Sequence, residues 1–131
     1  MPDLVATMPH AVELGIQLQD ASPEAVTATM PYAERHTTLG GALHGGALMA
    51  FADTVGALCA VANLPAGAGT STIESKTNFF RAVRGGIVTA TCNPLHVGRS
   101  TIVLQTTLRD DHGKWVAQVT QTQAVLGEKK V

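Results

Sequence analysis

A single carboxylate, Asp53, stands in an otherwise apolar or small-residue stretch, LHGGALMAFADTVGALCAVA (residues 43–62), which contains no Lys or Arg to pair with it. Burying an unpaired carboxylate is costly, so such a group persists where a partner satisfies it or where a reaction uses it. A carboxylate held in this way can act as a general base toward water or as a nucleophile toward an acyl carbon. The alternative is a structural role, in which Asp53 bonds a buried hydroxyl or amide, or faces water across a dimer interface.

The residues His44-Gly45-Gly46 open this stretch, at the point where a helix is predicted to begin. The first N–H groups of a helix lack internal acceptors, and the helix dipole is positive at that end. Because glycine lets another molecule approach the backbone closely, the motif suits an anion or a developing oxyanion. The alternative is that the glycines only permit a tight turn and close packing. Asp53 lies about 10 Å further along the axis, so both groups serve one substrate only if it lies along the helix or reaches across from a partner subunit.

One long helix is predicted over residues 46–63, closed by the following Pro and Gly residues. One side of this helix is large and apolar (Leu48, Phe51, Val55 and Leu58). Apart from Met49, the neighbours on the Asp53 side are small: Gly46, Ala50, Gly56, Ala57 and Ala60. Small residues on that face leave room for another helix or for a ligand.

The remaining sequence favours strands, because apolar residues alternate with polar ones and β-branched residues are frequent. Strands are predicted at 16–19, 25–32, 70–82, 87–97, 101–109 and 114–126, a short helix at 8–14 and a loop at 34–41. A lone apolar helix among antiparallel strands must be covered by the sheet. We therefore predict one α+β domain over residues 1–131, with a five- or six-stranded antiparallel sheet wrapped around one long central helix. Since this helix is apolar nearly all round, a homodimer is expected to complete its burial.

Composition narrows the function classes. The 131 residues are 45% apolar and 15% charged, which is typical of a folded domain. A formal net charge of -1 and 4% aromatic residues favour neither nucleic-acid binding nor base stacking. The run 42–64 is interrupted by His44, two glycines and Asp53, which argues against a membrane span. The N-terminus lacks a signal-peptide pattern, so a cytoplasmic protein is expected.

Other reactive groups lack the patterns that sites of known chemistry require. The histidines form no metal-binding pair, the serines no G-x-S-x-G elbow, and the glycines no phosphate loop, so no metal and no cofactor are predicted. Cys59 and Cys92 lie in apolar or strand-like stretches and are expected to be small buried thiols. The tail, residues 127–131, is expected to fray.

The combination of His44-Gly45-Gly46, six intervening residues and Asp53, within two strands, a helix and four further strands, resembles the hotdog-fold acyl-CoA thioesterases. The nearest resemblance is to their phenylacetate-degradation branch, and it covers the chain from about Met8 to Leu126. It implies that Asp53 is the nucleophile or general base, that the Gly45 N–H polarises the thioester carbonyl and that His44 positions this group. It further implies that Thr72, contributed by the partner subunit, helps to hold the attacking water.

The resemblance also implies contacts with coenzyme A in the loop formed by Gly98, Arg99 and Ser100. Arg81, by its charge, is a candidate for contact with the phosphates of such a carrier at a dimer rim, and Gly46, at the helix start, is a further candidate for substrate binding. One position departs from the pattern: six residues before His44, where relatives often carry Asn or Gln, this chain has Thr38. A threonine hydroxyl is shorter than those amides and differently placed. The carbonyl- or water-binding role of this position either passes to Thr38 itself or is altered.

The implied activity is hydrolysis of a small aryl or short- to medium-chain acyl-CoA by a homodimer or a dimer of dimers. Two alternatives stay open: a hotdog dehydratase or hydratase acting on acyl thioesters, and a non-catalytic acyl-CoA-binding protein. The sequence leaves undecided the acyl group, the choice between nucleophile and base for Asp53, and the choice between dimer and tetramer.

Overall fold

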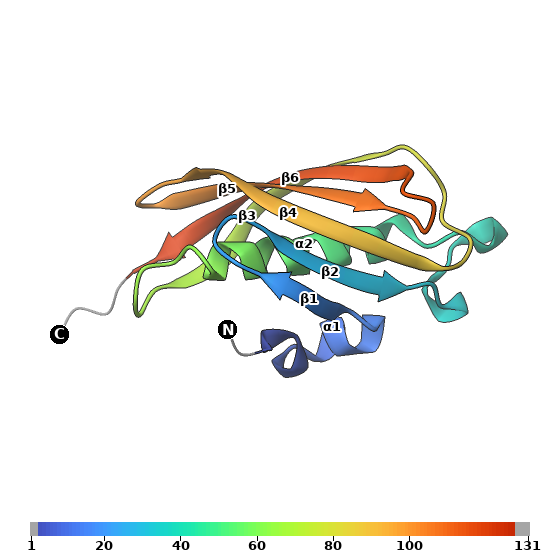
Figure 1. The fold of residues 1–131 in the computed structure, drawn as a ribbon, viewed down its shortest axis with the longest axis horizontal. Helices are drawn as coiled ribbons and strands as arrows, with labels where there is room; N and C mark the ends of the chain where they lie inside the picture. The colour runs from blue at the N-terminus through green and yellow to red at the C-terminus, as the bar shows by residue number, and fades with distance from the viewer. Residues whose placement is uncertain (1–2, 128–131) are drawn as a thin grey trace.

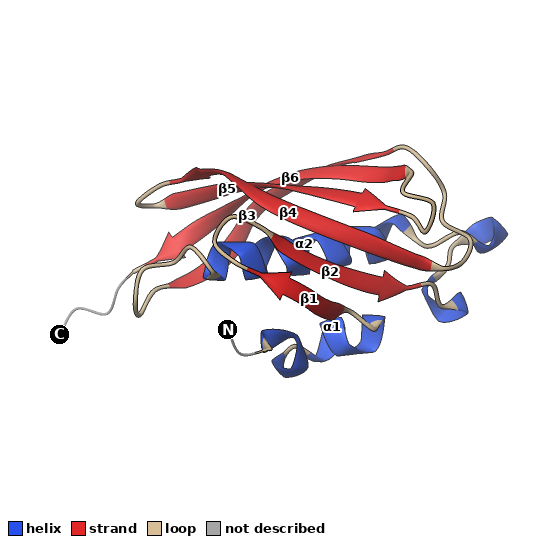
Figure 2. Ribbon diagram, in the orientation of Figure 1, coloured by secondary structure: helices blue, strands red, loops and turns tan. Residues whose placement is uncertain are grey.

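The computed structural model describes residues 3–127, and Figures 1 and 2 show its single long helix beside a layer of strands. The strands are β1 (Gln17–Ala21), β2 (Val26–Pro31), β3 (Gly69–Phe79), β4 (Ile87–Val97), β5 (Thr101–Arg109) and β6 (Trp115–Leu126). The α-helices are α1 (Pro9–Leu14) and α2 (Gly45–Val61), and short 3-10 helices are η1 (Leu4–Thr7), η2 (Glu34–His36) and η3 (Leu39–Gly41). Residues 128–131 of the tail predicted to fray lie outside the described residues.

The six strands form one antiparallel sheet in the order β1-β2-β4-β5-β6-β3. This confirms the predicted α+β architecture and fixes the strand number at six. After β2 the chain runs through α2 and re-enters the sheet at its far edge as β3, so the helix spans the width of the sheet (Figure 1). The edge strands are thus β1, which is bulged between Leu18 and Asp20, and β3.

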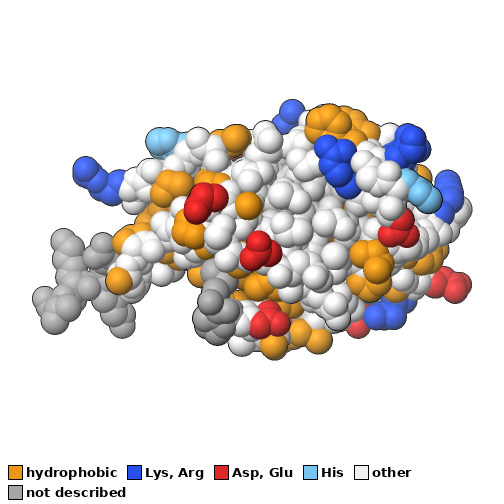
Figure 3. Space-filling view, in the orientation of Figure 1, with side chains coloured by type: hydrophobic (Ala, Val, Ile, Leu, Met, Phe, Trp, Pro, Cys, Tyr) orange, Lys and Arg blue, Asp and Glu red, His pale blue; other side chains and the backbone are white. Residues whose placement is uncertain are grey.

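The core lies between α2 and the inner face of the sheet. Phe51, Val55 and Leu58 are at most 2% exposed, and they are three of the four residues predicted to form the apolar side of the helix. In β2, β4 and β5 buried residues alternate with partly exposed ones, as a sheet with one covered face requires. The outward positions are mostly Thr and Gln, and the face shown in Figure 3 is largely uncharged.

The uncovered face of α2 is narrower than the helical spacing predicts. Met49 is 39% exposed, and Asp53 and Ala57 are partly exposed, as expected for that face. Gly56 and Ala60, predicted to share it, are buried. The reason at Gly56 is the side chain of Gln121 from β6, whose amide occupies the space that a β-carbon would fill.

Both cysteines are buried free thiols, as predicted. The thiol of Cys59, on α2, points to the carbonyl oxygen of Cys92, on β4, at 3.8 Å. The hydrogen bond between the two thiols, together with burial, raises the pKa of Cys92, so this thiol stays protonated and chemically quiet. Within residues 3–127, none of the helices combines the length and apolarity needed to traverse a lipid bilayer.

Phe51 is the largest fully buried side chain of the core, so it offers a direct test of the packing. We expect Phe51→Ala to lower the free energy of unfolding by about 3–5 kcal/mol, because it removes buried apolar surface and leaves a cavity. Denaturant unfolding measures the change. Leu39→Ala is the control: this side chain is 96% exposed, and its truncation should alter stability by less than about 0.5 kcal/mol. Equal losses in the two variants would contradict the described core.

Candidate active site

The carboxylate of Asp53 is held by two uncharged donors. Its Oδ1 accepts a hydrogen bond of 2.6 Å from the Thr72 hydroxyl on β3 and one of 3.0 Å from Nε2 of Gln121 on β6. Among residues 3–127, no Lys, Arg or His forms an ion pair with it. The side chain is partly buried, so the missing basic partner seen in the sequence is replaced by a hydroxyl and an amide.

A second glutamine extends this arrangement into the core. Nε2 of Gln123 donates to the Thr72 hydroxyl at 2.6 Å, and Oε1 of Gln123 accepts from the Thr70 hydroxyl at 2.9 Å. Gln121 and Gln123 are both fully buried, and their alternate positions on β6 place them on the inner face of the sheet. The sequence interpretation missed both residues. The signal was available, since the inward positions Ala117 and Val119 are followed at the same spacing by two glutamines.

Thr72 belongs to the same chain as the carboxylate it contacts, which corrects the expectation that a partner subunit contributes it. Strand β3 pairs with β6 so that Thr72 lies opposite Gln123, and the strand is bulged directly after it, between Thr72 and Glu74. The single hydroxyl proton points to Asp53, and one lone pair accepts from Gln123. Thr72 therefore has no proton left to donate to a water molecule.

A hollow of about 250 Å³ lies over the carboxylate, on the uncovered face of α2. Its walls come from α2 and from β3: Met49, Ala50, Asp53, Thr72 and Ser75. The acid thus lines a small hollow together with two hydroxyl groups and two apolar side chains.

The start of α2 carries one free N–H group. Nδ1 of His44, the N-cap residue, accepts from the Gly46 N–H at 2.7 Å. The Gly46 N–H is thereby used inside the chain, which leaves the Gly45 N–H without an acceptor among residues 3–127. Of the two predicted glycine amides, the structure leaves only that of Gly45 available to a bound molecule.

The loop before α2 is tied down from two sides. The His44 N–H donates to the carbonyl oxygen of His36 at 2.8 Å. The carboxylate of Glu13, on α1, accepts from the side chains of His36 and Arg35 at 2.8 and 3.1 Å. These two hydrogen bonds hold the pKa of Glu13 below its ordinary value, and the one from His36 has the larger effect. The helix start is therefore anchored through η2 to α1.

A second hollow, of about 300 Å³, lies beside Gly45. Most of its lining is apolar: Ala42, Leu43, Leu48, Phe79, Phe80, Ala82 and Val83, together with Gly45 and Arg81. A β-carbon on Gly45 would lie 3.2 Å from the ring of Phe79, so glycine keeps this approach open. The structure thus brings Arg81 to the same hollow as the free amide.

The other predicted residues lie apart from this cluster. Asp53 lies eight positions after Gly45, and this spacing corresponds to about 12 Å along the helix axis. One chain therefore cannot bring both groups to the same carbonyl group. The turn formed by Gly98, Arg99 and Ser100 joins β4 to β5 at the opposite end of the molecule from the start of α2 (Figure 1). Thr38 is exposed in the loop before α2, and its backbone N–H donates to Ala42.

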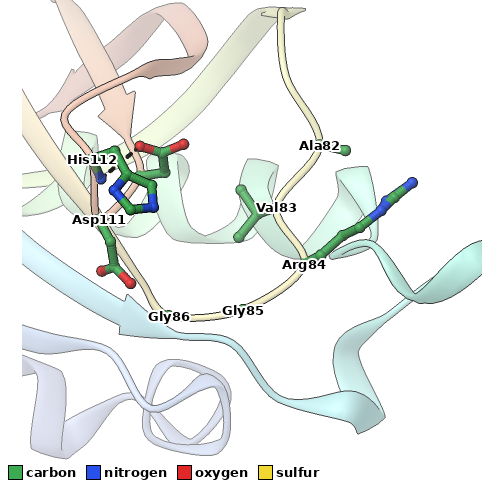
Figure 4. A pocket seen from close by; sticks show the side chains of 8 residues that line it. Ala82, Val83, Arg84, Gly85, Gly86, Asp111 and His112 are labelled. Atoms are coloured by element: carbon green, nitrogen blue, oxygen red, sulfur yellow. Dashed lines mark hydrogen bonds between the residues drawn. The ribbon is translucent and has the colours of Figure 1, made fainter.

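Another hollow, of about 360 Å³, lies between the β3–β4 loop and the β5–β6 turn (Figure 4). Its carboxylates are already engaged with the backbone: Asp111 accepts from the Ile87 N–H, and Asp110 accepts from the N–H groups of His112 and Lys114. Figure 4 shows Arg84 extending away from Asp111 and His112. These hydrogen bonds stabilise two turns, and they do not bring reactive side chains together. Within residues 3–127 there is also no group of three or more His, Cys, Asp or Glu side chains placed to hold a metal ion.

Comparisons with known proteins place this geometry in a family. Residues 40–117 match the thioesterase superfamily, a segment that runs from the loop before α2 into β6. The chain is 32% identical over 114 residues to the proofreading thioesterase EntH of Cronobacter turicensis, covering 87% of this chain and 83% of that protein.

Solved structures agree in fold. A thioesterase from Haemophilus influenzae superposes with a TM-score of 0.87 at 30% identity, covering 92% of this chain and 85% of that one. A mutant thioesterase from Pseudomonas aeruginosa gives 0.88 at 30% identity, covering 96% and 95%. The motif at the start of α2, the helix itself and strands β3, β4 and β5 lie within the matched residues 40–117. The chain described here belongs to the thioesterase superfamily and has its hotdog fold.

Proposed function

We propose that the protein is an acyl-CoA thioesterase that hydrolyses a small aryl or short- to medium-chain acyl-CoA in a site formed by two copies of the chain. One observation carries the proposal: a partly buried carboxylate, without a basic partner among residues 3–127, is held by neutral donors and lines a hollow. The two hollows, of about 250 and 300 Å³, are of a size that suits acyl groups of this range. A cytoplasmic location goes with the proposal, since a reducing compartment keeps Cys59 and Cys92 as thiols.

The dimer follows from the separation of the two reactive groups. Gly45 and Asp53 lie equally far on either side of Met49, on the face of α2 that its own sheet leaves uncovered. A two-fold axis passing near Met49 would set the two central helices antiparallel, with Gly45 of one copy opposite Asp53 of the other. Strand β3 is an edge of the sheet and exposes Ile73 at 58%, so the same axis can pair the β3 strands of two copies.

In this arrangement the thioester carbonyl oxygen accepts the Gly45 N–H at the positive end of α2, which stabilises the negative charge that develops on it. Asp53 of the other copy works from the opposite side of the carbonyl carbon. It removes a proton from water as the water oxygen attacks, or it attacks directly and forms a mixed anhydride that water then cleaves. In both routes the C–S bond breaks and the thiolate of coenzyme A leaves and takes up a proton. We propose that Arg81, which lines the hollow beside Gly45, contacts the coenzyme A portion. The turn of residues 98–100, at the other end of the same chain, is proposed to do so from the second copy.

Asp53→Asn tests the acid. The amide keeps the size of the side chain but can neither accept a proton from water nor attack, so we expect kcat to fall by at least about 100-fold. Thiol release from a panel of aryl and aliphatic acyl-CoAs measures turnover, and circular dichroism confirms that the fold is kept. Asp20→Asn, at an exposed carboxylate on β1, is the control and should match the wild type. Near-normal turnover of Asp53→Asn would remove this residue from the mechanism.

Gly45→Pro tests the free amide. Gly45 is the first residue of α2, a position where proline fits a helix, and the preceding residue, His44, already has the extended conformation that proline requires. The substitution replaces the N–H by the ring carbon Cδ, and we expect kcat to fall about 100- to 1,000-fold. Gly45→Ala is the matched variant: it meets Phe79 in the same way but keeps the N–H, so it should retain most of the turnover. Equal losses in both variants would indicate a steric effect.

Mixing the two inactive variants tests whether the site is shared. In a heterodimer of Gly45→Pro with Asp53→Asn, one of the two shared sites holds an intact Gly45 and an intact Asp53. With random re-association, about a quarter of the wild-type thiol release should return. A site contained within one chain would give no recovery, because each chain then lacks one of the two groups.

A further inference from the structure

We propose that Gln121 and Gln123, two buried glutamines of β6, are positioning residues that fix which oxygen of Asp53 reacts. The inference rests on the proposed function of Asp53 and adds a role for residues outside the motif at the start of α2. It depends on three features of the described structure: the direction of each hydrogen bond, the unused carbonyl of Gln121 and the absence of a side chain at Gly56.

Both donors to Asp53 reach the same oxygen. Oδ1 accepts from Thr72 and from Gln121, at 2.6 and 3.0 Å, which occupies both of its in-plane lone pairs. No residue among 3–127 donates to Oδ2. The carboxylate therefore presents Oδ2 to the hollow, and the hydrogen bonds at Oδ1 stop the group from rotating about its Cβ–Cγ bond.

The buried hydrogen bonds run in one direction, toward the acid. The carboxylate of Asp53 can only accept, so the Thr72 hydroxyl donates to it and leaves its oxygen to Nε2 of Gln123. Oε1 of Gln123 then lies 2.9 Å from the Thr70 hydroxyl, which also lies 2.8 Å from the carbonyl oxygen of Ala124. Gln123 thus supports the direction of the Thr72 hydroxyl without touching the carboxylate.

The orientation of Gln121 has a cost in stability. Its Oε1 is buried without a hydrogen-bond partner among residues 3–127, which costs about 1–3 kcal/mol of folding free energy. Turning the amide over would not help, because Oε1 would then face Oδ1 of the carboxylate. An apolar side chain of similar volume would avoid the unpaired group altogether. What Gln121 supplies, and an apolar residue does not, is a donor directed at Asp53.

Gly56 makes room for that donor. A β-carbon at this helix position would overlap Oε1 and the amide carbon of Gln121. Glycine lowers helix stability by about 1 kcal/mol relative to alanine, and the position is buried in the middle of α2. The glycine and the glutamine form one unit, in which the helix omits a side chain so that the amide can reach the acid one turn earlier.

Gln121→Leu tests the positioning role in the full-length dimer, with the acyl-CoA that the wild type hydrolyses fastest. We expect kcat to fall about 10- to 100-fold while KM changes less than about twofold, because the carboxylate is still present but no longer held. Gln118→Leu is the matched control: Gln118 is a glutamine of the same strand that faces the other side of the sheet and bonds Thr107. Its kinetics should equal those of the wild type. A folded Gln121→Leu dimer with wild-type kcat would overturn the proposal.

A double-mutant cycle separates positioning from general loss of structure. Gly56→Ala should lower kcat by displacing the amide of Gln121, but it should have no further effect on kcat in a Gln121→Ala background. If Gly56→Ala lowers kcat equally with Gln121 present and in the Gln121→Ala background, Gly56 acts independently of Gln121, and the proposed coupling between the two residues is overturned. If Gln121→Leu does not fold, Gln121→Met serves instead: it keeps an unbranched side chain of similar length, removes the donor to Asp53 and should lower kcat in the same way.

A substrate-free measurement keeps this inference separate from the proposed activity. In ¹⁵N NMR spectra, the side-chain amide protons of Gln121 should exchange slowly in the wild type and measurably faster in Asp53→Ala. One outcome would reject the positioning role but keep the proposed function: Asp53→Asn is inactive, Gln121→Leu has wild-type kcat, and the Gln121 amide protons of the wild type exchange fast. If the wild type releases no thiol from any acyl-CoA but the Gln121 protons are protected by Asp53, the proposed function fails and the hydrogen-bonded unit stands. Fast exchange of the Gln121 amide protons in the wild type would overturn the positioning role, whether or not the protein releases thiol from an acyl-CoA.

Discussion

A carboxylate set between a helix and a sheet must find donors within the protein, and this requirement organises the centre of the molecule. Asp53 faces a sheet whose inner surface is mostly apolar, so its donors have to come from the few polar side chains placed there. Its two donors, Thr72 and Gln121, lie on the adjacent strands β3 and β6, together with Gln123, which donates to Thr72. The pairing of these two strands is therefore what puts the donors at the correct height along the helix.

The helix that carries Asp53 also presents a free N–H group, which the proposed reaction requires, but this group lies at a distance from the acid. His44 caps α2 and uses the Gly46 amide, while Gly45 remains open beside an apolar hollow. The acid and the amide are thus displayed by one rigid element and kept about two turns apart. In the proposed dimer, a rigid spacing of this kind would fix the geometry of the shared site as soon as two copies meet, with no loop movement needed to bring the groups together. The anchoring of the preceding loop to Glu13 on α1 adds to this rigidity.

Much of the fold could be predicted from the sequence because it depends on periodic patterns. The long helix, the strands and the turn at residues 110–113 follow from alternation, helical spacing and turn residues, and the motif before Asp53 marks the start of α2 correctly. What escaped prediction depends on register. The bulge after Thr72 and the pairing of Thr72 with Gln123 decide that this hydroxyl reaches the acid of its own chain, and nothing local to Thr72 encodes that pairing. Gln121 and Gln123 continue the alternation of Ala117 and Val119, so their face can be read from the sequence, but their contacts with Asp53 and Thr72 depend on the pairing of β6 with β3. The role of Gly56 depends in turn on Gln121, which lies 65 positions further along the chain.

The two edges of the sheet differ in a way that limits how the protein can assemble. Strand β1 is short and interrupted by a bulge between Leu18 and Asp20, and α1 lies beside it, so that edge is a poor template for another strand. Strand β3 offers 11 residues at the opposite edge. With one edge open and the other blunted, growth through main-chain pairing ends once two molecules have joined, and the chain can expose an edge strand without the risk of forming open-ended fibres.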